Sequence, residues 1–353
     1  MRKYYRRVIF SKTPLKSQFR FEDRFQILPI VSENAPSSPF ARHFPLFIEY
    51  YIDYSDKDYP NGIGLIKEIE AQQVVEDEYI NLLSVLSNHH FFKYRGNRFN
   101  WGVITPKEGY DKLSPEEEAE HENQVSTWII GGYVYPGLKK DLIIDGFSDF
   151  KFPATAIIST YYQYFQTDPL DDEKKEITFP ETMYDSLINY FQLSPKINKK
   201  VKSSILLICD GIEISDYKRS LAFLSYVSAI EAFVGLEYSD KEVEFECHSC
   251  KAIKSSPHVC KVCGKPIWGI KTKFKEFLIK YVAGSESSVV KYNKIYNLRC
   301  RIAHMGQLFI SDYEFSLDNR KDSDSEWLMK LETLQIARIS ITNWLLNKNK
   351  ACR

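Results

Sequence analysis

Residues 296–306 read Tyr296-Asn297-Leu298-Arg299-Cys300-Arg301-Ile302-Ala303-His304-Met305-Gly306. Apolar side chains recur in this stretch at helical spacing, which predicts the end of an amphipathic helix running from about Ser285 to Met305. Gly306 follows the last apolar position, and glycine is common directly after a helix end. The stretch therefore places Arg299 and His304 in the last two turns of one helix.

Arg299 and His304 are the strongest candidates for chemistry in the chain. The residues Ile295, Leu298, Ile302 and Met305 are predicted to form the buried seam of the helix, which directs Arg299 partly away from the core. On an ideal helix a five-residue spacing separates two side chains by about 140°, so they converge only if the helix end unwinds or a partner chain completes the site. An interhelical salt bridge and a histidine at a helix C-terminus fit the same pattern, so the spacing leaves both interpretations open.

The same helical periodicity extends over the whole C-terminal half. Helices are predicted to begin at Pro180 and Pro195, because proline favours the first turn, and a long helix is predicted from about Asp216 to Gly235. Further helices are expected near 267–283 and from about Glu326 to Asn347. Residues 176–353 are therefore predicted to form an all-helical bundle.

Paired cysteines interrupt this bundle at 245–266. Two CxxC pairs separated by nine residues supply the ligand set of a closed tetrahedral zinc site, made of Cys247, Cys250, Cys260 and Cys263. No ligand position is left for water in such a set, so the predicted zinc is structural, and no catalytic metal is expected. The nearby His248 and His258 are interpreted as bystanders.

The cysteine segment is also basic. From Cys247 to Lys280 the chain has eight lysines and one acidic residue, Glu276. A small positive unit of this kind can contact phosphates, but lysines that keep an insertion soluble give the same composition. Both interpretations stay open.

The first half of the chain, residues 1–175, has short apolar runs typical of strands and little helical pattern. A helix is predicted from Glu76 to Asn88, and a hairpin at 91–101 with Gly96-Asn97 as its tight turn. Basic and aromatic residues alternate in that hairpin, a composition that suits single-stranded nucleic acid and equally an ordinary two-faced hairpin. The charged run at 169–176 is interpreted as a linker, so the chain is predicted to have an N-terminal mixed α+β domain and a C-terminal helical domain.

Composition narrows the class of protein further. The 353 residues carry 47 basic and 47 acidic side chains, so no net charge draws the whole molecule to nucleic acid or to a membrane. No apolar run approaches the length of a membrane span, and the unpaired cysteines, Cys209, Cys300 and Cys352, are scattered as expected in a reducing compartment. These features predict a soluble cytoplasmic protein without a membrane partner.

The stretch 225–233, Ser-Tyr-Val-Ser-Ala-Ile-Glu-Ala-Phe, together with 295–306 resembles the HEPN superfamily, particularly its Apea-like branch. The resemblance covers about Pro195 to Asn347. HEPN proteins are helical bundles, often dimers, and many are metal-independent ribonucleases with an Arg-x4–6-His motif. The resemblance gives Arg299 and His304 the family's catalytic positions and Glu231 the place of an acidic residue that steadies the arginine. The family commonly has a polar residue such as asparagine directly after the arginine, where this chain has Cys300.

The resemblance implies an endoribonuclease that acts on RNA, as a homodimer, in antiviral defence or as a toxin. The chemistry is physically reasonable, because RNA carries its own 2′-hydroxyl nucleophile, a histidine exchanges protons near neutral pH, and a guanidinium binds two phosphate oxygens. The N-terminal domain would then act as a sensor or substrate selector. The alternative is a non-catalytic dimerisation or RNA-binding module in which Arg299 and His304 pack.

Overall fold

The computed structural model describes residues 1–30, 43–55, 63–93, 99–101, 114, 116, 128–130, 133–135, 142, 144–149, 151–166, 175–238, 245–246, 249–251, 253–254, 268–313 and 320–348. The chain is mixed α+β, with a sheet in its N-terminal part and mostly helices in its C-terminal part, which confirms the predicted fold class at that level. Contacts group the chain into two compact units: Met1–Ser159 with Asp168–Glu181, and Thr160–Thr167 with Thr182–Arg353. We call them the sheet unit and the helical unit and describe each by itself.

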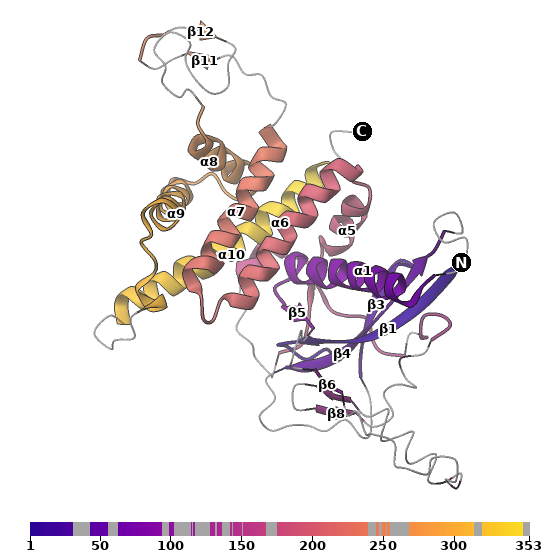
Figure 1. The fold of residues 1–353 in the computed structure, drawn as a ribbon. Helices are drawn as coiled ribbons and strands as arrows, with labels where there is room; N and C mark the ends of the chain where they lie inside the picture. The colour runs from indigo at the N-terminus through magenta and orange to yellow at the C-terminus, as the bar shows by residue number, and fades with distance from the viewer. Residues whose placement is uncertain are drawn as a thin grey trace. The chain divides into compact units, whose positions relative to one another are not determined.

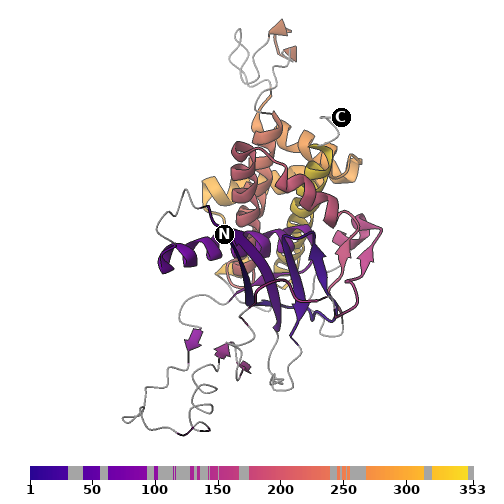
Figure 2. The same ribbon diagram turned by 90° about the vertical axis from the view of Figure 1, so that its right-hand side faces the viewer.

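The sheet unit is built on five antiparallel strands in the order β2-β3-β4-β1-β5. Their bounds are β1 Arg2–Ser11, β2 Phe19–Phe21, β3 Phe25–Pro29, β4 Phe44–Asp53 and β5 Phe91–Phe92. Helix α1 (Leu65–Leu86) lies along one face of the sheet (Figure 1 and Figure 2). The ring of Tyr79 stacks on Phe25 with centroids 4.7 Å apart, so aromatic packing joins the helix to the strands.

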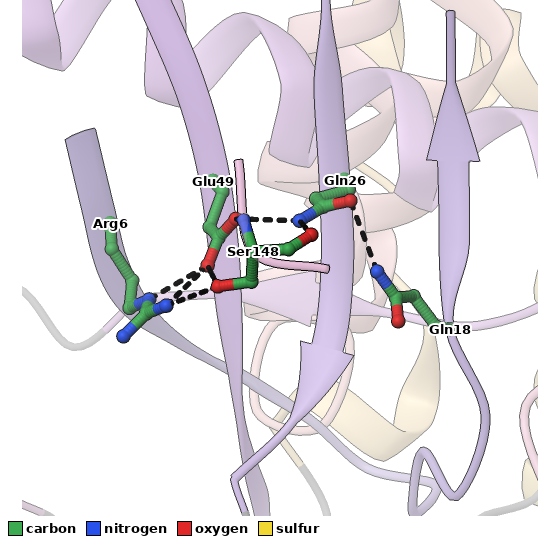
Figure 3. A network of polar contacts seen from close by, with 5 residues as sticks. All are labelled: Arg6, Gln18, Gln26, Glu49 and Ser148. Atoms are coloured by element: carbon green, nitrogen blue, oxygen red, sulfur yellow. Dashed lines mark hydrogen bonds and ion pairs between the residues drawn. The ribbon is translucent and has the colours of Figure 1, made fainter. Parts of the chain in front are cut away.

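The other face of the sheet carries a second apolar cluster of Val8, Phe10, Leu28 and Phe47, which Leu142 and Phe152 help to cover. Beside this cluster lies a buried polar network across β1, β4 and β3 (Figure 3). Glu49, whose side chain is 0% exposed, accepts hydrogen bonds from Arg6 Nε at 2.8 Å and from Gln26 Nε2 at 2.6 Å. The backbone N–H of Ser148 donates to the same carboxylate at 2.8 Å. The network therefore ties the segment around Ser148 to three strands.

Two predictions for this half of the chain were wrong. Helix α1 begins at Leu65 rather than at Glu76. The prediction started at the buried apolar face, whereas the first turns of the helix expose their apolar residues Leu65, Ile66 and Ile69. The hairpin at 91–101 does not form, since β5 pairs with β1 while β6 (Phe99–Trp101) pairs with β7 (Trp128–Ile130). The proposed turn at Gly96-Asn97 lies outside the described residues. Phe91 is buried in the large sheet, and this long-range packing decides the pairing rather than the local turn sequence.

Three further strands complete the sheet unit. Strand β8 (Tyr133–Tyr135) pairs with β7, and β9 (Ile157–Ile158) forms a short parallel pair with β10 (Phe179–Pro180). Pro180 is therefore the end of a strand, and the helix predicted to begin there starts at Met183 instead.

The helical unit has seven described α-helices and one 3-10 helix. Their bounds are α4 Tyr161–Gln166, α5 Met183–Phe191, α6 Pro195–Ile214, α7 Arg219–Tyr238, α8 Ile270–Tyr281, α9 Glu286–Met305, η3 Ile310–Asp312 and α10 Arg320–Lys348. Helix α7 packs against α6, α8, α9 and α10, and Figure 1 shows it among them. It is therefore the central helix of the unit.

Helix α7 packs closely against two of its neighbours, α6 and α10. A Cβ atom on Gly211 of α6 would lie 2.5 Å from Cε1 of Tyr226, so glycine allows the two helices to approach. On another side of α7, Phe233 meets Trp344 of α10 edge-to-face at 5.0 Å. Among the described residues, α7 alone has the length and composition of a candidate membrane span, with half of that window buried in the structure. A core helix of a soluble protein passes the same test, so this feature is compatible with a soluble protein.

Candidate functional site

Helix α9 positions both residues of the predicted Arg and His pair. Ser285 caps its start, since its Oγ accepts from the N–H of Ser288 at 3.3 Å. Gly306 ends the helix in the left-handed region at φ 66°, and its N–H donates to the carbonyl of Arg301. His304 therefore stands in the last turn, where the helix dipole favours a cation.

Arg299 lies on the side of α9 that faces the core. The buried residues of α9 are Tyr292, Ile295, Tyr296 and Ile302. The predicted seam was wrong at its C-terminal end, because Met305 is 68% exposed. The core-facing side is therefore centred near Arg299, so this arginine points toward α7 rather than away from the bundle.

Glu231 of α7 receives that arginine. Nη2 of Arg299 donates to Oε2 of Glu231 at 3.1 Å, with the two side chains 23% and 17% exposed. Glu231 is the acidic residue that the sequence resemblance placed beside the arginine, and the structure brings the two together. The ion pair spans two helices and fixes one edge of the guanidinium.

The other edge of the guanidinium reaches His304. Nη1 of Arg299 lies 2.9 Å from Nε2 of His304. A hydrogen bond at this contact has Nε2 as the acceptor and the ring proton on Nδ1, because an arginine has no acceptor.

The two side chains meet inside one chain although α9 stays helical through Met305. The prediction that convergence needs an unwound helix end or a partner chain was therefore wrong. The 140° separation describes where the Cα–Cβ bonds point, whereas the long arginine side chain can follow the helix surface over the five-residue rise of about 7.5 Å. Side-chain length, rather than helix distortion, closes the gap.

Electrostatics keep the arginine charged in this setting. Burial by itself lowers the pKa of Arg299, but the charge of Glu231 and its hydrogen bond raise it more, and the net pKa is raised. Burial also raises the pKa of the nearby Tyr296 hydroxyl, and the charge of Glu231 adds to this shift. The site therefore presents a permanent cation, a neutral phenol and an imidazole.

Sequence reasoning missed the carboxylates that hold the loop after α9. Asp312 of η3 accepts from the N–H groups of Arg219 and Ser220 at 2.7 and 2.8 Å and so caps α7. Glu326 of α10 accepts from the N–H groups of Ile310 and Ser311 at 2.7 and 3.2 Å. These contacts join residues up to 93 positions apart, so spacing in the sequence gave no signal for them.

An open groove lies between this loop, α9 and α10. Its volume is about 1000 Å³, and it is lined by residues of all three segments, including Lys294, Arg301, Phe309 and Tyr313. Volumes of this order are typical of ligand sites. The groove adjoins the helix end that carries His304.

Comparisons with known proteins do not assign the chain to a family. No family model, curated protein or solved structure matches it. The arrangement of Arg299, His304 and Glu231 therefore has to be judged by its own geometry.

The predicted zinc ligands fall mostly outside the described residues. Cys247, Cys260 and Cys263 lie there, whereas Cys250 is described and exposed. Strands β11 (Phe245–Glu246) and β12 (Ile253–Lys254) pair across the first CxxC, and Lys251 directly after Cys250 has φ 56°. A hairpin with a left-handed residue after the second cysteine can turn backbone N–H groups toward thiolates, so the described part fits a zinc knuckle.

The remaining candidate residues lie in the sheet unit. Lys93 contacts the carboxylates of Asp77 at 2.7 Å and Glu76 at 3.7 Å, so two acids of α1 pair with this lysine. His89 Nε2 lies 3.1 Å from both the carbonyl and the amide nitrogen of Thr178. That contact gives His89 a structural role in the sheet unit. Among the described residues, no group of three or more metal-binding side chains comes together.

Proposed function

We propose that the helical unit is a metal-independent endoribonuclease of HEPN type, which cleaves RNA through attack by the 2′-hydroxyl. The observation that carries this proposal is the placement of one guanidinium between Glu231 and His304, with Nη2 on the carboxylate and Nη1 on the imidazole. The family resemblance predicted these three residues from their types and places in the chain. Their contacts supply the groups that the reaction needs.

His304 is suited to move the protons. Its Nε2 carries the lone pair that would accept the proton of the 2′-hydroxyl as that oxygen attacks the adjacent phosphorus. The P–O5′ bond then breaks, giving a 2′,3′-cyclic phosphate and a 5′-hydroxyl after the leaving oxygen takes a proton. In a two-fold homodimer a second His304 would supply that proton, and we include such a dimer in the proposal.

Arg299 is suited to bind the phosphate, and Glu231 to position the arginine. Because Nη2 is engaged by Glu231, the guanidinium keeps its place while Nη1 exchanges His304 for a phosphate oxygen. The substrate thereby frees Nε2 of His304 as it binds. The exposed surface of His304 and the 23% exposure of Arg299 leave a path for a phosphodiester.

The proposal has further parts taken from the sequence. The cysteine segment at 245–266 binds one structural zinc inserted into the helical domain, and the N-terminal domain acts as a sensor or substrate selector. The setting is antiviral defence or a toxin in the cytoplasm. The described β11–β12 hairpin around Cys250 supports the zinc insertion.

A second candidate is a non-catalytic dimerisation or RNA-binding module. This candidate is favoured by the contacts of Arg299, which binds Glu231 and His304 at the same time. We call this three-residue arrangement, which joins α7 to the end of α9, the clasp. In that case the three residues stabilise the bundle and react with nothing.

A cleavage assay with the full chain separates the two candidates. Labelled single-stranded RNA is incubated without added divalent metal, so that the proposed zinc is not stripped, with wild type, His304→Ala, and Lys199→Gln as a control on the exposed side of α6. The nuclease predicts products with 2′,3′-cyclic phosphate ends, made by wild type and the control, and a loss of roughly 10²- to 10⁴-fold in His304→Ala. Equal cleavage by wild type and His304→Ala, or none by wild type, contradicts the proposal, and the second result favours the module.

A further inference from the structure

The groove beside α9 has the chemistry of a single-stranded nucleic-acid site. Two exposed cations, Lys294 and Arg301, lie on its α9 wall, and neither forms an ion pair with a described residue. Leu308, which is 44% exposed, contributes apolar surface, and Tyr313 lines the groove with 65% of its surface exposed. Free cations next to apolar surface and an exposed aromatic ring are the combination that holds unpaired nucleotides.

The acidic residue of the groove, Glu326, offsets only one of these two charges, and it is held at the loop rather than at α9. Both carboxylate oxygens of Glu326 accept hydrogen bonds from η3, at 2.7 Å from the N–H of Ile310 and at 2.9 Å from the hydroxyl of Ser311. A further cation approaches the same wall, since Lys271 Nζ donates to Oδ1 of Asn297 at 2.9 Å. The α9 side of the groove is thus positive.

The groove also lies on the same side of α9 as the proposed base. On an ideal helix His304 is turned about 20° from Asn297 and about 60° from Arg301, both of which line the groove. A strand that lies along these two residues therefore leads toward His304. The opposite side of α9, with Ile295 and Ile302, is buried, and Arg299 starts from that side. Its guanidinium reaches His304 at 2.9 Å, so the groove approaches the pair from the histidine.

We propose that this groove is the substrate subsite of the ribonuclease and binds the nucleotides next to the scissile bond of single-stranded RNA. Lys294 and Arg301 contact backbone phosphates, and a base stacks on Tyr313. Calling the bound RNA a substrate rests on the proposed function. RNA binding in the groove can be tested without cleavage.

The test measures binding of a short fluorescent single-stranded RNA by anisotropy, without added divalent metal, with all variants built on His304→Ala so that the probe stays intact. Lys294→Gln with Arg301→Gln should weaken binding and reduce the slope of log K against log salt by about 1.4, since two phosphate contacts are lost. Tyr313→Ala should weaken binding roughly 5- to 150-fold through lost stacking. Lys199→Gln with Lys200→Gln removes the same charge from the exposed side of α6 and should have little effect on either quantity.

Three outcomes decide the matter. Equal effects of the groove pair and the α6 pair, or full affinity in Tyr313→Ala, overturn the groove whatever the cleavage assay shows. Groove-dependent binding of RNA without cleavage by wild type keeps the subsite and removes the nuclease. Equal binding of a DNA strand of the same sequence contradicts a preference for RNA, because the 2′-hydroxyl is then not recognised.

Discussion

Strands β1 and β4 carry two ion pairs that differ in burial and thereby allow one strong prediction. Arg6 pairs with Glu49 and Arg2 pairs with Asp53, in both cases between residues directly opposite in the same antiparallel ladder. Glu49 is 0% exposed, whereas Arg2 and Asp53 have 45% and 58% of their side chains exposed. Replacing each carboxylate by its amide, as Glu49→Gln and Asp53→Asn, should therefore have very different effects.

The expected size of the Glu49 effect follows from its donors. Glutamine is neutral, so the ion pair with Arg6 is lost in either orientation of its amide (Figure 3). Its single acceptor oxygen also leaves either Arg6, or the N–H groups of Gln26 and Ser148, facing an N–H group without an acceptor. Breaking a buried ion pair by removing one partner costs about 3–5 kcal/mol. In Asp53→Asn water replaces the lost contact, and the stability of the sheet should stay close to that of wild type.

The measurement is urea-dependent hydrogen exchange at the amides of β1 and β4, which reports the sheet unit separately from the helices. With a typical urea slope of about 2 kcal/mol per molar, Glu49→Gln should lower the midpoint by on the order of 2 M. Similar midpoints for the two variants would refute the reasoning, because burial would then not decide how much each ion pair contributes to the free energy of unfolding.

Three other predictions concern the site, a buried acid and the metal. Glu231→Gln should lower the rate of RNA cleavage by releasing Arg299, with the helical circular dichroism unchanged; an unaltered rate would remove Glu231 from the site. Burial raises the pKa of Glu76, so folding favours its protonated form and stability falls as pH rises through that raised pKa. Glu76→Gln should therefore stabilise the sheet unit at pH 7 and lose this advantage below about pH 4, whereas a pH-independent difference in urea midpoints would contradict the cause. Elemental analysis should find one zinc per chain and less in Cys260→Ser, and a well-folded wild type without metal would exclude the knuckle.

Local signals in the sequence were sufficient to place the helix that carries the site. Ser285 and Gly306 mark the start and end of α9 through their own backbone and side-chain preferences, and both act in the structure as those preferences predict. The hairpin at 91–101 failed for the opposite reason. Its turn sequence was local, but the partner of β5 is β1, some eighty positions earlier in the chain, and packing chose between them.

The candidate site shows a similar division. The types and positions of Arg299, His304 and Glu231 could be predicted from the sequence, while the idealised helix gave a wrong picture of how they meet. The groove could not be predicted, because Glu326 shapes its loop by binding the backbone of η3. Nearly every residue type has the same backbone N–H group, so a side chain that binds the backbone of a distant segment leaves no pattern in the sequence of that segment.

The clasp and the nuclease use the same three side chains, and they differ in what happens to Nη1 of Arg299. In a clasp the contact with His304 is the final one, so a phosphate has no reason to displace it. In the nuclease the contact is a resting state, in which the basic nitrogen of His304 is held until a stronger, charged acceptor arrives. Because Glu231 holds Nη2 in both cases, the guanidinium need not leave its place for this exchange. An exposed imidazole beside a positive groove makes that exchange accessible to RNA, which is the physical reason for preferring the nuclease over the clasp.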